Sequence, residues 1–350
     1  MTEDARWLSG LEEQARARLA APVFEYVAQG ARDGQTASRA VDTWAAVEFH
    51  PHVLRDVTDV GLETELLGSP VGVPWGVAPS TLQRAIHPDG ELAMARATAQ
   101  AGGVMVVSSN AGTPFSLIGE TGVRWWLQAY LPADRTLAVP MLDRAVAAGA
   151  SAVVLTVDTP VVGTKYPVGR VVWDVVDPAL LRVNFDKGTD ERPGADKALD
   201  LGPHDVDWLA EHTGLPVVVK GVLRPDDAVR CVQAGARAVW VSNHGGRQLD
   251  RAVSTAAVLR EVIAAVGEQA QVYVDGGVRS GLDVVAALSL GADAVFLGRL
   301  PLYALTDGEP GVARMHREVG AQVVETMRLS GCRTLADVAA LHAPSAPNHP

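Results

Sequence analysis

The stretch that decides the fold is Ala238-Val239-Trp240-Val241-Ser242-Asn243-His244-Gly245-Gly246-Arg247-Gln248. Its four apolar residues predict a buried strand, and a polar loop with two glycines follows directly. An α/β barrel keeps its chemistry at this carboxyl end of its strands. His244 can take a proton near neutral pH, and Arg247 can hold a carboxylate or phosphate through two parallel hydrogen bonds. The alternative is that this loop only reverses the direction of the chain. We favour a functional site, because polar residues also stand at the ends of other predicted strands.

From Val71 onward, apolar strand-like runs alternate with helix-like stretches, which is typical of repeated strand-helix units with a parallel sheet. We expect strands at 71–78, 104–108, 125–131, 152–157, 216–220, 238–242, 272–275 and 294–297. Eight is the strand number of a (β/α)8 TIM barrel, and this α/β fold is our prediction. The helices in between should end at left-handed glycine caps, at Gly102, Gly149, Gly235 and Gly291.

The chain length of 350 residues is enough for one barrel domain, predicted over 1–341, because such barrels take about 250 residues. Residues 1–70 are expected to form an N-terminal extension, with helices at 7–20 and 23–27 (closed by Gly30) and a hairpin around Gly61 and Gly68. The interval 160–208 is too long for an ordinary strand-helix connection and predicts a lid over the barrel mouth. Beyond a long helix at 311–331 and a short one at 334–341, residues 342–350 are a predicted disordered tail.

Composition excludes several classes of protein. With 48% hydrophobic and 20% charged residues and no run of 18 apolar residues, the chain is expected to be soluble and not to span a membrane. A net charge of −11 argues against nucleic acid and anionic membranes as partners. The acidic start, Met1 to Arg6, lacks the features of a signal peptide, so a cytoplasmic location is expected. The spacing of Cys231 and Cys332 supports neither a disulfide framework nor a metal site, and both are expected to be buried packing residues.

Polar residues end several predicted strands. Lys220 ends strand five, where a desolvated lysine needs an electron-rich partner, although a snorkelling lysine is the alternative. Thr156 and Asp158 share a face at the end of strand four, and a carboxylate there can orient a histidine from strand six, or else cap a turn. The other such residues, each of which could be a satisfied core polar group, are Ser108, Gln128 and Tyr130. Together they predict a polar rim for an aromatic, hydrogen-bonding cofactor with a phosphate tail.

Two glycine-arginine motifs follow the last two predicted strands, Asp275-Gly276-Gly277-Val278-Arg279 and Leu297-Gly298-Arg299. Each motif alone is weak, since loop geometry also explains it. The loops after strands seven and eight are, however, the usual phosphate grip of barrels, so we favour phosphate binding.

With these residues in view, the chain resembles the FMN-dependent α-hydroxy acid oxidase and dehydrogenase family, which includes glycolate oxidase, lactate oxidase, mandelate dehydrogenase and hydroxymandelate oxidase. The resemblance runs from about Leu8 to Leu341. The run 242–248 agrees with the family's active-site signature, and further agreement lies at 78–79, 87–91, 156–160, 220–221 and 275–279.

The resemblance implies FMN across the barrel mouth, with its ring near Pro79, Ser80, Thr81, Ser108, Gln128, Thr156, Lys220 and Ser242. It implies a phosphate site at Gly277, Arg279, Gly298 and Arg299, with Asp275 near the ribityl chain. His244 would take a proton from the substrate while Asp158 steadies the imidazolium, and Lys220 would favour negative charge on the reduced cofactor. The implied contacts to the small-molecule substrate are Arg247, on the carboxylate, and Tyr26 and Tyr130. Relatives also imply a homo-oligomer, a tetramer.

Two residues depart from the family pattern. Lys165 stands where a second carboxylate-binding arginine belongs, and lysine keeps the charge but loses the planar two-pronged fit. Thr81 stands where alanine or glycine is usual beside the flavin's reactive edge. The first departure puts carboxylate recognition in question, and the second puts the choice between oxidase, oxygenase and dehydrogenase in question.

The function expected first is therefore FMN-dependent oxidation of a 2-hydroxy acid to the 2-oxo acid, with O2 the favoured electron acceptor over another acceptor. A specialised biosynthetic tailoring oxidase acting on a larger or non-standard substrate is the alternative, motivated by Lys165 and the lid. A flavin-binding protein without catalysis is disfavoured by the presence of His244, Asp158 and Arg247. Type 2 isopentenyl diphosphate isomerases share the phosphate grip but lack the run 242–247.

Overall fold

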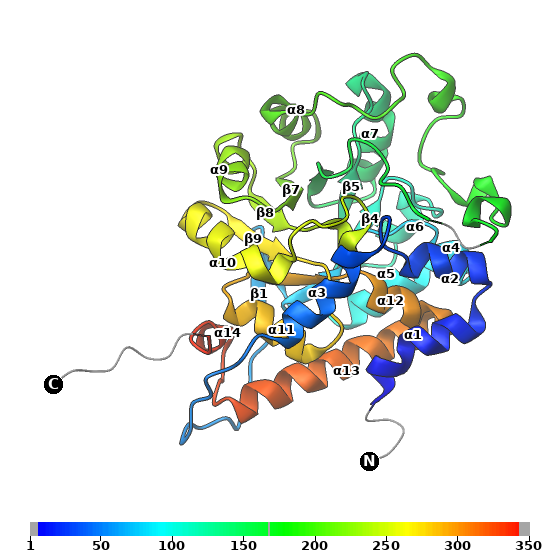
Figure 1. The fold of residues 1–350 in the computed structure, drawn as a ribbon. Coiled ribbons are helices and arrows are strands. Elements are labelled where there is room, and N and C mark those ends of the chain that lie inside the picture. Colours follow the sequence, from blue (N-terminus) through cyan, green and yellow to red (C-terminus); the bar gives the residue numbers. More distant parts are fainter. Residues whose placement is uncertain (1–5, 167–168, 343–350) are drawn as a thin grey trace.

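The centre of the molecule is a closed barrel of eight parallel strands, seen in the computed structural model, which describes residues 6–166 and 169–342 (Figure 1). The strands are β3 (Trp75–Val77), β4 (Val104–Ser108), β5 (Arg124–Ala129), β6 (Val153–Thr156), β7 (Val217–Val222), β8 (Ala238–Val241), β9 (Gln271–Val274) and β10 (Ala294–Leu297). β10 closes the barrel against β3. The predicted TIM barrel is confirmed, and the predicted strands after the first lie within two residues of β4 to β10 at either end.

The predicted first strand, 71–78, is wrong in part. Val71 ends a separate hairpin strand, and the barrel strand starts only at Trp75. Pro74 lies between them, and proline has no N–H to give to a strand ladder. The hairpin itself joins β1 (Thr64–Leu66) and β2 (Ser69–Val71) through Leu67 and Gly68, both with positive φ, while Gly61 lies outside its turn.

Helices surround the barrel. They are α4 (Gln83–Ile86), α5 (Gly90–Gln100), α6 (Phe115–Gly119), α7 (Val139–Ala147), α8 (Pro203–Thr213), α9 (Pro225–Gln233), α10 (Thr255–Val266), α11 (Gly281–Ser289), α12 (Arg299–Ala304), α13 (Gly308–Leu329) and α14 (Leu335–Val338). The glycines predicted as left-handed caps all have positive φ, between 69° and 102°. No described helix is both long and apolar enough to cross a membrane.

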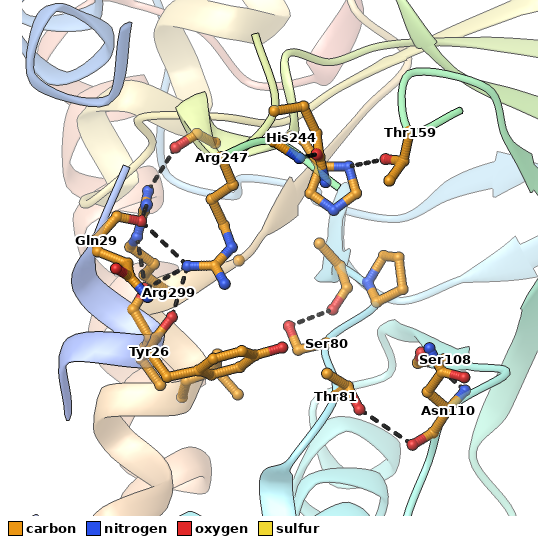
Figure 2. A pocket seen from close by; sticks show the side chains of 18 of the residues that line it. Tyr26, Gln29, Ser80, Thr81, Ser108, Asn110, Thr159, His244, Arg247 and Arg299 are labelled. Atoms are coloured by element: carbon orange, nitrogen blue, oxygen red, sulfur yellow. Dashed lines mark hydrogen bonds between the residues drawn. The ribbon is translucent and has the colours of Figure 1, made fainter. Parts of the chain in front are cut away.

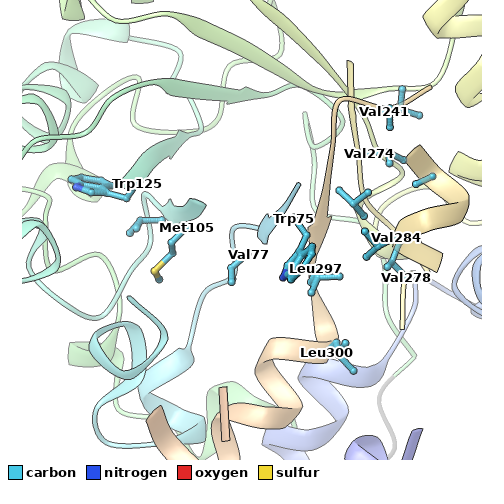
Figure 3. Close-up of a cluster of buried hydrophobic side chains, with 14 of the residues drawn as sticks. Trp75, Val77, Met105, Trp125, Val241, Val274, Val278, Val284, Leu297 and Leu300 are labelled. Atoms are coloured by element: carbon cyan, nitrogen blue, oxygen red, sulfur yellow. The ribbon is translucent and has the colours of Figure 1, made fainter. Parts of the chain in front are cut away.

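Apolar side chains form two layers of core. One layer lies between the strands and the outer helices, and Figure 3 shows part of it, including Trp75, Val284 and Leu297. The other fills the barrel interior, where the rings of Trp240 and Phe296 have centroids 4.0 Å apart. Replacing one such aromatic residue by alanine would lower the free energy of unfolding by about 3–5 kcal/mol. This interior plug forms the base on which the polar strand ends rest.

The N-terminal extension contains α1 (Trp7–Arg18), α2 (Ala21–Ala28) and α3 (Gln35–Ala45). The second helix ends at Ala28 rather than at Gly30. The sequence analysis missed α3, because its many polar residues leave no clear apolar pattern along the buried face of the helix. That helix matters for the site because the Trp44 indole Nε1 donates to the Gly276 carbonyl oxygen at 2.6 Å.

The described part of 160–202, which we call the lid segment, contains short 3₁₀ turns, η3 (Val172–Asp174), η4 (Pro178–Leu180) and η5 (Thr189–Glu191), and no α-helix. Residues 203–208, expected in the lid, belong to α8. The predicted tail, apart from His342, lies outside the described residues. Cys332 is buried, whereas Cys231 is only partly buried.

Candidate active site

A cavity of about 740 Å³ opens at the carboxyl ends of the barrel strands, within the usual size of ligand sites. Its wall combines α2, the loops that follow the strands, and the lid segment. All predicted site residues except Asp158 and Ser242 line it, namely Tyr26, Pro79, Ser80, Thr81, Ser108, Gln128, Tyr130, Thr156, Lys165, Lys220, His244, Arg247, Asp275, Gly277, Arg279, Gly298 and Arg299. The two exceptions each contact a residue that lines the cavity, Asp158 through His244 and Ser242 through Lys220.

The His244 ring lies beside Asp158 and Thr159 at the cavity edge (Figure 2). His244 Nδ1 is 3.0 Å from Asp158 Oδ1, and the Thr159 hydroxyl donates to the same carboxylate oxygen at 3.1 Å. Because Nδ1 faces the carboxylate, Nε2 is the ring nitrogen left for a ligand. The pair therefore has the geometry of a general base with an orienting carboxylate.

Asp158 is held ionised despite its surroundings. Burial opposes its ionisation, but the charge and hydrogen bond of His244, the charge of Lys220 and the Thr159 hydroxyl together lower its pKa. A Cβ on Gly221 would lie 2.6 Å from the Asp158 Cβ, and Gly221 has a φ of +112°. Glycine at this position is what allows the carboxylate to sit against β7.

Gly221 also forms an irregularity in the barrel. Lys220 pairs with Trp240 in the register of β7 and β8, but Val222 already pairs with Val241, so Gly221 is an extra residue. Such a bulge bends the strand and re-aims its side chains. The bulge directly follows Lys220, whose side chain lines the cavity although it comes from a barrel strand.

Lys220, Ser242 and Asp275 form a buried network on the cavity floor. The Lys220 ammonium lies 3.0 Å from Asp275 Oδ2 and donates to Ser242 Oγ at 2.8 Å, while that hydroxyl donates to Asp275 Oδ1 at 2.6 Å. The ion pair is almost completely buried, so removing either partner would leave an uncompensated charge. Ser242 Oγ also accepts the backbone N–H of His244, at 3.1 Å, which links the floor to the His244–Asp158 pair.

A second polar chain runs across the ends of β4, β5 and β6. Gln128 Nε2 donates to Thr156 Oγ1 at 3.1 Å, and Ser108 Oγ donates to Gln128 Oε1 at 3.3 Å. All three side chains are buried yet border the cavity. They present fixed hydrogen-bonding groups to a flat polar ligand.

Arg247 is held by α2. Its Nη1 donates to the carbonyl oxygens of Tyr26 at 2.6 Å and Gln29 at 3.1 Å, and its guanidinium carbon lies 4.9 Å from the centre of the Tyr26 ring (Figure 2). The guanidinium also acts on the Tyr26 hydroxyl, through its charge and a hydrogen bond. It borders the cavity, where its planar set of N–H groups suits a carboxylate. Burial raises the pKa of Tyr26, which keeps its hydroxyl protonated as a donor.

Arg299 makes several hydrogen bonds within the protein that the sequence does not predict. Its guanidinium donates to the carbonyl oxygens of Val27 at 3.0 Å, Gly245 at 2.9 Å and Gln29 at 3.1 Å. Burial, reinforced by the charges of Arg279 and Arg247, lowers its pKa to about 9. The residue thus ties α2 to the loop of His244, in addition to lining the cavity.

The two departures from the family pattern also have defined contacts. The Lys165 ammonium donates to the carbonyl oxygens of Gly163 and Arg247. Burial, with the charges of Arg247 and Lys197, lowers its pKa to about 8. The Thr81 hydroxyl donates to the Asn110 carbonyl oxygen at 3.0 Å (Figure 2).

Several lining residues were missed by the sequence analysis. Thr159 could have been found from its place beside Asp158 at a strand end. The others carry no local signal, because they come from loops, mainly from the lid segment, and include Asn110, Trp173, Arg182 and Lys197.

Comparisons with known proteins agree with this geometry. A family model described as FMN-dependent dehydrogenase matches residues 15–343. The chain belongs to this family. It is 37% identical to glycolate oxidase 3 of Arabidopsis thaliana, over 95% of this chain and 94% of that one. It is also 37% identical to an L-lactate oxidase of Nostoc, over 93% and 94% of the two chains. A structure of mandelate oxidase with (S)-4-hydroxymandelic acid superposes with a TM-score of 0.88 at 35% identity, covering 95% of this chain and 97% of that one.

Membership makes the chain an FMN-dependent oxidoreductase that acts on CH–OH groups, with FMN as its cofactor. The cavity fits this cofactor. The Asp283 carboxylate accepts the backbone N–H of Arg279, while the Arg279 guanidinium donates to the Val278 carbonyl oxygen and lines the cavity. A Cβ on Gly298 would meet no atom within 4 Å, so this cation borders open space where a phosphate is expected. Lys220 and Gln128 supply polar groups for the flat ring.

Proposed function

We propose that the enzyme oxidises a 2-hydroxy acid to the corresponding 2-oxo acid and passes the electrons to O2. The observation that carries this proposal is the His244–Asp158 pair at 3.0 Å, beside the Arg247 guanidinium at the same cavity. The names of the relatives, which are oxidases of glycolate, lactate and mandelate, support the substrate class and the acceptor.

In this proposal Arg247 binds the substrate carboxylate through its guanidinium, and the hydroxyl groups of Tyr26 and Tyr130 hydrogen-bond the substrate oxygens. His244 takes one proton at Nε2. The resulting imidazolium is stabilised by Asp158, whose charge the surrounding donors maintain. Bound FMN supplies the two-electron acceptor. Oxidation of C2 releases two electrons and two protons in total, and O2 takes them up as hydrogen peroxide.

The cofactor contacts are part of the same proposal. Arg279 and Arg299, with the loops at Gly277 and Gly298, would hold the phosphate, and Asp275 would serve the ribityl chain. The residues that would hold the ring are Pro79, Ser80, Thr81, Ser108, Gln128, Thr156 and Lys220, with Ser242 behind Lys220.

Steady-state assays test the proposal. The purified yellow protein, mixed with lactate, glycolate or mandelate in air, is expected to consume O2, release equimolar peroxide and form the 2-oxo acid, which mass spectrometry identifies. Product formation only with an added dye, without O2 uptake, would contradict the choice of acceptor. Turnover of only large substrates would favour the specialised tailoring oxidase.

We also propose that the chain assembles as a homotetramer. Family membership and the exposed apolar side chains of Val53 and Leu54 support an interface. Light scattering should give about four times the 36.8 kDa chain mass.

A further inference from the structure

Positive charge is concentrated on the lid side of the cavity. Lys165, Arg170, Arg182 and Lys197 all line it, although the chain as a whole has a net charge of −11. Most of these cations already have oxygen partners. Lys165 donates to two carbonyl oxygens, Arg170 to the Asp174 carbonyl oxygen, and Arg182 pairs with Asp190 at 2.7 Å.

Lys197 differs from the other three. Its ammonium lies 3.9 Å from the centre of the Tyr130 ring, and no carboxylate lies within 4 Å of it among the described residues. No acceptor for its N–H groups is present among those residues either. An ammonium that stacks on an aromatic face keeps donors for a ligand on its other side. The side chain is partly buried, so leaving those donors without a partner is costly.

The backbone fixes the place of Lys197. Lys197 forms an isolated β-bridge with Pro132. Two backbone hydrogen bonds flank it: the Ala198 N–H donates to the Leu131 carbonyl oxygen at 2.9 Å, and the Ala133 N–H donates to the Asp196 carbonyl oxygen at 2.8 Å. The segment that anchors Lys197 therefore directly follows Tyr130 in the chain. These backbone contacts hold the Lys197 segment beside Tyr130, so the contact between the ammonium and the ring is fixed by the fold.

The cavity thus holds two cation-tyrosine pairs from different elements. Arg247 lies over the Tyr26 ring of α2, and Lys197 lies over the Tyr130 ring after β5. The proposed function uses the first pair for the carboxylate on C1. Among the described residues, Lys197 has no ion pair within 4 Å, and the charge of Asp158 acts on it only from farther away, so its charge and hydrogen-bond donors match a second anion.

We propose that Lys197 binds a second carboxylate at the far end of the substrate, so that the preferred substrates are 2-hydroxy dicarboxylic acids. This inference rests on the proposed function and names the substrate class of the same site. Lys197 acts in specificity and takes no part in proton transfer.

A matched substrate pair tests the inference. 2-Hydroxypentanedioate and its 5-amide have nearly the same shape, but only the first carries the second charge. We expect kcat/KM to be about ten-fold higher for the dianion, as one charged hydrogen bond implies. Lys197→Met should remove this preference by raising KM for the dianion alone, and Lys197→Arg should retain it. Lys187→Met is the control, because Lys187 is an exposed lid residue outside the cavity.

Binding gives a readout that does not depend on turnover. In calorimetric titrations of the flavin-loaded protein, pentanedioate should bind about ten-fold more weakly to Lys197→Met than to the native chain, and pentanoate should bind both equally. Equal use of acid and amide by the native enzyme, or an unchanged preference in Lys197→Met with intact flavin absorbance, would overturn the inference. If monocarboxylic hydroxy acids are still oxidised in that case, the proposed function stands. If no hydroxy acid of either kind reduces the flavin, the proposed function itself fails.

Discussion

Charged side chains on the floor of the cavity and on its lid side have different kinds of partner. On the floor, the Lys220 ammonium is 4% exposed and bonded to Ser242 and Asp275, all at the ends of adjacent strands. On the lid side, Lys165 is bonded to backbone carbonyls, and Lys197 lies on an aromatic ring. The floor is fixed by the barrel, so it suits chemistry common to many substrates. The lid side is fixed by hydrogen bonds between loops, so it suits the choice of substrate.

Removing the base should have the largest effect. His244→Ala is expected to slow reduction of the bound flavin by about 10⁴-fold, because general-base catalysis is lost while the floor and the phosphate site remain. Anaerobic mixing with a 2-hydroxy acid measures this rate. His212→Ala is the matched control, since His212 also pairs with an aspartate but lies on α8 outside the cavity. A colourless His244→Ala protein, or one reduced at the native rate, would contradict the assignment.

The orienting carboxylate should matter less than the base. Asp158→Asn keeps the shape but removes the charge that stabilises the imidazolium, so we expect reduction to slow by about 10²- to 10³-fold. The control is Asp143→Asn, because Asp143 is the partner of His212 at 3.1 Å. Equal, small effects of the two substitutions would show that the His244–Asp158 contact is only structural.

Crowding between β7 and the catalytic pair should appear as lost stability. Gly221→Ala is expected to lower the free energy of unfolding by about 2–3 kcal/mol, because the new Cβ meets Asp158 at 2.6 Å and the backbone has a positive φ. Urea denaturation measures the loss. Gly149→Ala separates the two causes, since Gly149 has a φ of +86° but open space around it, and it should cost only about 1 kcal/mol.

The lid side should show a small effect of pH. Lys165 has a pKa of about 8, so its charge is present below pH 8 and lost above it. An anionic substrate should therefore bind less well as the pH rises through 8, with KM increasing about three-fold, as expected for a partly exposed charge. Lys165→Met should abolish this dependence, and Lys165→Arg should stay at the low KM throughout. A rise in KM that persists in both variants would assign the titration to another group.

The contrast between floor and lid side also explains how far the sequence could be interpreted. The floor residues follow apolar runs directly, and parallel strands bring their carboxyl ends together, so Lys220, His244 and Asp275 could be predicted as neighbours. The Tyr130–Lys197 pair could not, because its members lie 67 positions apart in the sequence and loop hydrogen bonds bring them together. Helix α3 was missed because its buried residues, Thr36, Ala40 and Trp44, include only one large apolar side chain.

For two arginines the sequence indicated a place at the cavity but not the further contacts that hold the side chain there. Arg247 and Arg299 were predicted as ligand-binding groups from their positions after strands six and eight. The structure adds that both donate to carbonyl oxygens at the end of α2, among them that of Gln29. No spacing in the sequence predicts this contact, since it depends on how the extension packs on the barrel. The extension therefore helps to position Arg247, the arginine that we propose binds the substrate.

The most direct test of the central claim is anaerobic mixing of the purified protein with a panel of 2-hydroxy acids while the flavin absorbance is recorded. The panel should include lactate, glycolate, mandelate and 2-hydroxypentanedioate. We predict that at least one member bleaches the flavin and that the absorbance returns when air is admitted. A yellow, folded protein that no member bleaches would contradict the account of the site as a 2-hydroxy acid oxidase.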